Sequence, residues 1–214
     1  MNQSRDTILN NIRKSLGYNQ ISADTVKVLK ARLAAHTVHE QPALEQDLMS
    51  RFITKLEKVA GTLNSISHSK EIPFAVLAFL QQHNLPLEIV VDSRLKTLPW
   101  PNKFQIAYRA AQAKDVVSVN CAFAGIAETG SLVLLSSADC PTTLNFLPET
   151  HLIILYKDKL VAHIEEVWTH LRTQAMPRTV NIITGPSRTA DIEQTIQLGA
   201  HGPRRLHVIF VEKS

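Results

Sequence analysis

Short apolar runs alternate with amphipathic segments from about residue 70 onward, and this alternation restricts the possible fold more than any other feature. Short runs of apolar and β-branched residues are typical of buried strands, whereas apolar residues spaced by three and four indicate helices. We expect strands at 87–91, 104–108, 116–119, 131–135, 151–156, 179–184 and 206–211, and helices at 71–83, 163–172 and 189–198. Strands that alternate with helices predict an α/β fold with a mostly parallel sheet flanked by helices.

The first part of the sequence lacks this alternation and favours helices instead. Apolar spacing predicts helices at 4–16 and 22–36, with Ser4 as the N-cap of the first. We therefore divide the chain into an N-terminal helical extension, residues 1–42, and an α/β domain, residues 43–214. A length of 214 residues suits one domain with an extension, or two small domains.

A third amphipathic helix is expected after Pro42, with its end at Gly61 and a strand at 62–67. Its apolar residues between 44 and 59 form one stripe. Such a stripe suits a core face, and it also suits a surface that docks a partner subunit.

Charge and hydropathy give little support to a nucleic-acid or membrane partner. The net charge of +4 is not concentrated in a basic run, so we expect no nucleic-acid binding. No apolar stretch reaches the length of a membrane span, and the N-terminus lacks the apolar region of a signal peptide. We therefore expect a soluble, cytoplasmic protein.

The two cysteines, Cys121 and Cys140, are too few for an iron–sulfur cluster and match no zinc spacing. The nine histidines include no His-Glu-x-x-His pattern. We expect no metal or cofactor in this chain. Cys121 has an apolar context typical of an inert core thiol, and Cys140 lies in a loop without a neighbouring base.

The first candidate site lies at Glu128, Thr129 and Gly130, directly before the apolar run 131–135. A strand that starts at this turn places the Glu128 carboxylate at the strand's edge, beside any cleft, where it can act as acid, base or nucleophile. Thr129 and Gly130 are ligand-binding candidates in the same turn. The alternative is structural, with Glu128 capping a neighbouring helix or pairing with a surface arginine.

The second candidate segment contains Thr142, Thr143 and Asn145, which offer hydroxyls and an amide without charge. These groups suit hydrogen bonds to a ligand, and they also suit a turn between buried elements, which we favour. His151 opens the next predicted strand, and we expect it to be a structural histidine.

The third candidate segment joins a predicted strand to a predicted helix through Gly185, Ser187 and Arg188. The free N–H groups of a helix start attract a phosphate or carboxylate, and Arg188 can add a bidentate contact. An ordinary strand-to-helix turn, in which Asp191 pairs with Arg188, fits the same residues. His201 lies between glycines in a later loop and is a further, more accessible candidate.

Three blocks occur in a diagnostic order: Gly-Ile-Ala-Glu-Thr-Gly-Ser-Leu-Val-Leu at 125–134, Pro-Thr-Thr-Leu-Asn-Phe-Leu-Pro-Glu-Thr-His at 141–151 and Gly-Pro-Ser-Arg-Thr-Ala-Asp-Ile-Glu at 185–193. The last is followed by Leu-Gly-Ala-His-Gly-Pro at 198–203. Together they resemble the LUD-domain family, in particular its lactate-utilisation protein C group, over about residues 45–212. Some members carry an arginine where Thr142 and Thr143 stand here.

This resemblance implies a fold like that of the ribose-5-phosphate isomerase and CoA-transferase group, which includes the formyltetrahydrofolate cyclo-ligases. It implies a role in the oxidation of L-lactate to pyruvate, beside two partner proteins that carry the iron–sulfur clusters. A glutamate followed two positions later by glycine is similar to the catalytic motif of some CoA-transferases, and Glu128 matches it by fold-level analogy. The alternative is a stand-alone small-molecule enzyme or ligand-binding protein that uses Glu128, with an anionic ligand near Gly185, Ser187 and Arg188.

Overall fold

The computed structural model describes residues 3–17, 21–35, 40–45, 47–192, 195–198 and 201–213. The chain forms two compact units, Met1–Pro42 and Ala43–Ser214. No helix in these described ranges is long and apolar enough to cross a membrane.

The first unit contains the helices α1 (Gln3–Ser15) and α2 (Ala23–Ala34). Ser22 is the N-cap of α2, since its side chain accepts a hydrogen bond from the backbone N–H of Thr25. The prediction of Ser4 as the cap of the first helix is wrong, because α1 already includes that residue. Neither helix buries a side chain, so their apolar stripes are solvent-exposed.

A six-stranded sheet forms the centre of the second unit, in the order β1-β12-β7-β4-β2-β3, with every neighbouring pair parallel. Its strands are β1 (Thr62–His68), β2 (Glu88–Val91), β3 (Gln105–Ala107), β4 (Val117–Cys121), β7 (Thr150–Tyr156) and β12 (Arg205–Lys213). This parallel sheet confirms the predicted α/β class. Parallel sheets require cover on both faces, which explains the nearly continuous apolar character of β7 and β12.

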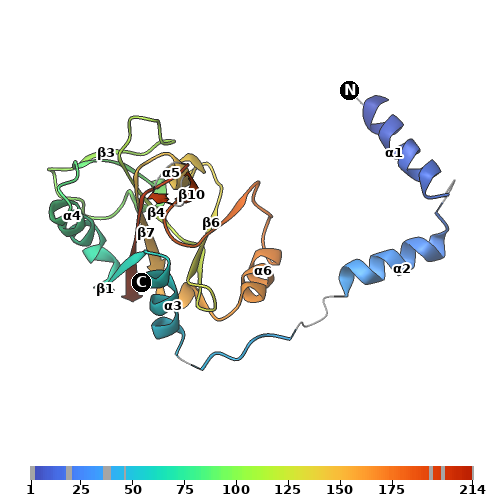
Figure 1. Ribbon diagram of the computed structural model, residues 1–214, viewed down its shortest axis with the longest axis horizontal. Helices are drawn as coiled ribbons and strands as arrows, with labels where there is room; N and C mark the ends of the chain where they lie inside the picture. Colours follow the sequence, from blue (N-terminus) through green and yellow to red (C-terminus); the bar gives the residue numbers. More distant parts are fainter. Residues whose placement is uncertain are drawn as a thin grey trace. The chain divides into compact units, whose positions relative to one another are not determined.

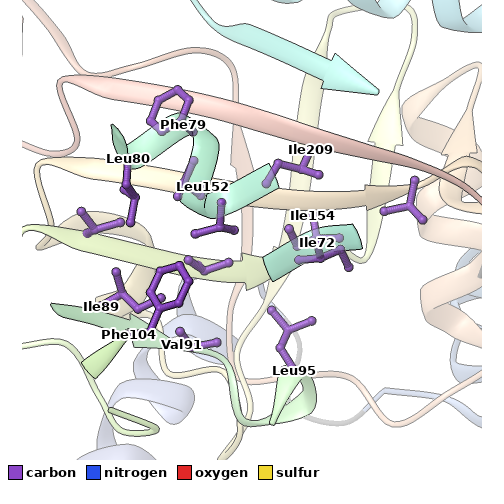
Figure 2. Packing of buried hydrophobic residues seen from close by; sticks show 14 residues of the cluster. Ile72, Phe79, Leu80, Ile89, Val91, Leu95, Phe104, Leu152, Ile154 and Ile209 are labelled. Atoms are coloured by element: carbon purple, nitrogen blue, oxygen red, sulfur yellow. The ribbon is translucent and has the colours of Figure 1, made fainter. Parts of the chain in front are cut away.

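The helix α4 (Ile72–Gln82) covers one face of the central sheet. Figure 2 shows its side chains over the alternate residues of β7 and β12, Leu152, Ile154 and Ile209. Pro73 stands in the first turn of α4, where the missing N–H has no intrahelical partner to lose. Burial of this helix face holds β1, β12, β7, β4 and β2 in one layer.

A helix and a second sheet cover the other face. The second sheet has the order β8-β5-β6-β9 and consists of β8 (Leu160–Val161), β5 (Ala124–Ile126), β6 (Ser131–Leu135) and β9 (Val180–Ile183). The helix α6 (Ile164–Arg172) packs on the far side of this sheet through Val167 and Leu171. The helices α4 and α6 therefore lie on opposite sides of the strands (Figure 1).

The helix α3 (Leu48–Lys58) starts later than predicted. The Asp47 side chain accepts hydrogen bonds from the backbone N–H groups of Met49 and Ser50, so this residue and not the region after Pro42 begins the helix. Phe52 and Leu56 are fully buried against the central sheet. The expectation that the apolar side of this helix faces the core is correct at these two positions. Burial there contributes about 2 kcal/mol to the free energy of unfolding for each side chain.

The helix predicted at 189–198 is wrong. The structure instead forms an antiparallel pair, β10 (Arg188–Ile192) and β11 (Thr195–Leu198). The sequence of this segment contains Thr189, Ile192, Thr195 and Ile196, and β-branched residues favour strands over helices. The short helix α5 (Thr143–Phe146) and the strands β5 and β8 were not predicted, because each is too short for a periodic pattern.

Candidate functional site

Glu128 lies in the tight turn between β5 and β6. The turn is closed by a hydrogen bond of 2.9 Å from the N–H of Gly130 to the carbonyl oxygen of Ile126. Gly130 has a φ of 70°, and a Cβ there would lie 2.6 Å from the backbone nitrogen of Leu56 in α3. Glycine is therefore required both by the backbone conformation and by the close approach of α3.

The Glu128 carboxylate contacts a histidine at the start of α6. Its Oε2 lies 3.1 Å from Nδ1 of His163, the N-cap residue of that helix, and its backbone N–H donates to the carbonyl of Ala162. Glu166 accepts hydrogen bonds from the N–H groups of Ala162 and His163, both at 3.0 Å. The side chain of Glu128 is 26% exposed and that of His163 is 11% exposed. The turn thus supplies a partly accessible carboxylate–imidazole pair that also ties the hairpin to α6.

A chain of hydroxyl groups continues from this turn to the end of β9. The Oγ1 of Thr129 lies 2.7 Å from Oγ of Ser131, which lies 2.6 Å from Oγ1 of Thr184. Thr184 directly precedes Gly185, so these contacts connect the first candidate segment with the third.

The second and third candidate segments share a cavity of about 250 Å³ with the loop that contains His201. Asn145, Gly185, Ser187 and His201, all predicted as ligand-binding residues, line it together. His151 also lines it, from the start of β7. The cavity lies at the amino ends of β7 and β12, whereas ligands of open parallel sheets usually bind at the carboxyl ends.

Backbone contacts hold the two loops of the cavity together. The N–H of Ser187 donates to the carbonyl of Pro203 at 2.8 Å. Gly185 has a φ of 85°, and a Cβ there would lie 2.7 Å from the carbonyl oxygen of Val59. The end of α3 therefore presses against the loop and admits only glycine at this position.

The polar wall of the cavity rests on Asn120, which sequence reasoning missed. The Nδ2 of Asn120 donates to Oδ1 of Asn145 at 2.7 Å, and its Oδ1 lies 2.7 Å from Nε2 of His151. All three side chains are buried. The signal in the sequence was a lone asparagine within the apolar strand 117–121, because a polar group buried in a strand requires partners.

This arrangement determines the protonation state of His151. Because the amide of Asn120 donates through Nδ2, its Oδ1 is the acceptor and Nε2 of His151 carries the proton. Nδ1 then holds a free lone pair, and it is buried without a hydrogen-bond partner within the described part of the chain. Burial lowers the pKa of His151 to about 3, so the ring is neutral at physiological pH.

Cys140 lies beside this wall, whereas Cys121 packs on the opposite face of the central sheet. The Sγ of Cys140 lies 3.6 Å from Nδ2 of Asn120. Burial raises the pKa of the Cys140 thiol to about 11 and that of Cys121 to about 12. Both thiols are therefore protonated near neutral pH, which supports the inert character expected for Cys121 and extends it to Cys140.

The remaining candidates lie outside the described lining of the cavity. The Oγ1 of Thr143 accepts from the N–H of Ala111 at 3.0 Å, which ties α5 to the loop after β3, and the carbonyl of Thr142 accepts from the N–H of Asn145. Arg188 is exposed at the start of β10, where the structure has no helix start to attract an anion. Within the part of the chain that the structure describes, Glu128 and the cavity are separate features, and the hydroxyl chain connects them.

Comparison with known proteins places the chain among a set of relatives. The LUD domain model matches residues 116–211. Lactate utilization protein C of Anoxybacillus flavithermus is 36% identical over 86 residues, which cover 40% of this chain and 39% of that protein, so the match spans well under half of that relative. Lactate utilization protein C of Halalkalibacterium halodurans is 28% identical over 240 aligned residues, with 99% of both chains covered.

The fold also resembles a solved structure. The crystal structure of a DUF162 family protein from Deinococcus radiodurans matches with a TM-score of 0.62 at 20% identity, covering 80% of this chain and all of that chain. This similarity supports the fold alone.

Proposed function

We propose that this chain, whose residues 116–211 match the LUD domain model, is a component of the system that oxidises L-lactate to pyruvate. The observation that carries the proposal is the similarity to Lactate utilization protein C of H. halodurans over 99% of both chains, which includes the N-terminal extension as well as the α/β domain.

The chemistry of the reaction requires electron carriers. Conversion of the secondary alcohol of L-lactate to the ketone of pyruvate releases two electrons and two protons, which need an acceptor. We propose that partner proteins with iron–sulfur clusters accept these electrons. Such clusters are usually held by four thiolates, whereas this chain has two cysteines. The clusters are therefore expected on the partners, and this chain supports the complex.

Growth of a deletion strain on L-lactate tests the proposal. The strain should fail to grow on L-lactate, grow normally on pyruvate, and recover on L-lactate when the wild-type chain is supplied. Any second lactate-oxidising enzyme is deleted in the same background. Normal growth of that strain on L-lactate without the chain would show that the proposal is wrong. Purification of the tagged chain from the complemented strain should also recover proteins with the visible absorption of iron–sulfur clusters.

A second candidate function is small-molecule chemistry that uses Glu128, and the contact between its carboxylate and His163 favours it. A carboxylate and an imidazole 3.1 Å apart, with the carboxylate partly accessible to solvent, can exchange a proton with a bound molecule. Glu128→Gln retains the size and the hydrogen bond while removing the charge. If this variant is as stable as the wild type and fails to restore growth on L-lactate, Glu128 has a chemical role. If it restores growth fully, the carboxylate is only structural.

A further inference from the structure

The cavity at the amino ends of β7 and β12 has a hydrogen-bond donor on its wall that the described chain does not use. Oδ1 of Asn145 accepts from Nδ2 of Asn120 at 2.7 Å, so the group of Asn145 that is left over is its NH₂, a donor. This NH₂ has no hydrogen-bond partner among the described residues, and it is not shut off from solvent. Asn145 is only 2% exposed and lines the cavity, so its accessible NH₂ faces the cavity.

Two further polar side chains line the cavity from the loops that follow β9 and β11. Ser187 is half-buried and His201 is exposed, and neither side chain has a hydrogen bond within the described ranges. A Cβ on Gly202 would lie 3.7 Å from Oγ of Ser187, so this hydroxyl stands beside the second loop. A hydroxyl and an imidazole can both donate. The cavity therefore offers three donors, and its described lining contains no aspartate or glutamate that would repel an anion.

The rest of the lining is largely apolar and includes Phe146, Ile182, Ile183 and Leu206. The volume of about 250 Å³ has room for a small organic molecule and not just for a single water. A fitting ligand thus has oxygen acceptors at one end and a short apolar body at the other.

We propose that this cavity binds a short aliphatic carboxylate. Its oxygens accept from the NH₂ of Asn145 and from Ser187 or His201, and its carbon chain lies against the isoleucines. A carboxylate only accepts hydrogen bonds, and bonds to an ionised acceptor are roughly twice as strong as neutral ones. Because Ser187 and His201 are not buried, the carboxylate stays partly hydrated, which limits its desolvation cost. The inference concerns binding by the isolated chain and does not rest on the lactate function.

Two pairs of probes that differ in charge but hardly in shape test the proposal. Propionate and propionamide form the first pair, and L-lactate and lactamide form the second. We expect each acid to bind the full chain with a dissociation constant on the order of 1 mM, and each amide about tenfold more weakly. Chloride at about 0.15 M screens unspecific attraction of anions to a chain of net charge +4. Calorimetry or ligand-detected NMR measures the affinities.

A series of chain lengths tests the apolar walls. Acetate, propionate and butyrate carry the same charge and differ by one methylene at each step. Burial of each methylene should raise the affinity about three- to fourfold. An anion held only by its charge at the surface would show the same affinity for all three.

The position of binding is tested with two lining variants and a matched control. Ser187→Ala removes one donor and should weaken propionate binding about tenfold. Gly202→Ala adds a methyl group 3.4 Å from Cβ of Ser187, an ordinary contact that the fold can accept, and this methyl should also weaken binding. Ser67 is exposed on β1 and does not line the cavity, so Ser67→Ala should bind propionate like the wild type. Equal melting temperatures show that all three variants are folded.

Several outcomes would overturn the proposal. Absence of saturable binding of both acids up to about ten times the expected constant of 1 mM would do so. So would amides that bind as tightly as their acids, an affinity that does not rise from acetate to butyrate, or full propionate affinity in both Ser187→Ala and Gly202→Ala. Growth on L-lactate is a separate readout. A deletion strain that fails to grow while the chain binds no carboxylate would refute this inference alone, and the reverse result would refute the lactate proposal alone.

Discussion

The Nε2 atom of His151 lies 2.7 Å from Oδ1 of Asn120, and both side chains are completely buried. The same asparagine also holds Asn145. One polar residue near the end of β4 therefore positions the side chains of Asn145 and His151. Its loss should lower the free energy of unfolding and change the local structure.

Asn120→Ala should lower the free energy of unfolding by about 3 kcal/mol, because it leaves the N–H of His151 and Oδ1 of Asn145 buried without partners. Ser118→Ala is the matched control on the same face of β4, where one hydrogen bond of 2.7 Å to the carbonyl of Leu144 is lost. That variant should cost only about 1 kcal/mol. Urea denaturation measures both, and equal losses would contradict the role given to Asn120.

Acid should destabilise the fold through two buried histidines. Burial lowers the pKa of His151 to about 3 and that of His207 to about 4, while the unfolded chain binds these protons below the ordinary pKa of 6.5. The unfolded state thus takes up more protons, so the contribution of these two rings to stability is constant above pH 6.5 and falls as the pH decreases toward 4. At pH 5 the loss is about 2 kcal/mol for each ring.

Denaturant unfolding at several pH values checks this loss, and NMR titration assigns it. Neither His151 nor His207 should titrate between pH 8 and about pH 5 in the folded protein. The nitrogen shifts of His151 should show the proton on Nε2 throughout. A titration step near the ordinary histidine pKa for either ring would contradict the prediction.

Gly130→Ala should destabilise the second unit by about 2 kcal/mol or more, because it adds a Cβ in a left-handed conformation against the backbone of Leu56. Gly17 is the matched control, since its φ of 71° is nearly the same but a Cβ there would meet no atom within 4 Å. Gly17→Ala should leave the melting temperature of this unit unchanged. A similar loss in both variants would mean that the φ angle alone, and not the approach of α3, accounts for the effect.

The thiols of Cys121 and Cys140 should react slowly. Their pKa values, raised to about 12 and about 11, leave a thiolate fraction about 100-fold or more below that of an ordinary cysteine. Labelling by iodoacetamide at pH 7.5 should therefore be slower by at least that factor in the folded chain than in urea. Rapid labelling of either residue in the folded protein would contradict this prediction.

The sequence alone determined the α/β class and most strands of the central sheet. These features follow from local periodicity, because a buried parallel strand and an amphipathic helix each leave a pattern in consecutive residues. The motifs also sufficed to suggest the LUD-domain family and a role in lactate utilisation. Asn145, Gly185, Ser187 and His201 could be chosen as candidates because polar residues and glycines stand out in loops between apolar strands.

Tertiary structure alone decided which candidates meet. Glu128 pairs with His163, 35 residues away in sequence, and Asn120 bridges Asn145 in α5 and His151 in β7. It also decided that residues after Arg188 form strands, where a helix was predicted. Contacts of this kind depend on how distant elements pack, which leaves no trace in local spacing. The contact between Nε2 of His151 and Asn120 likewise exists only because folding places the two residues side by side.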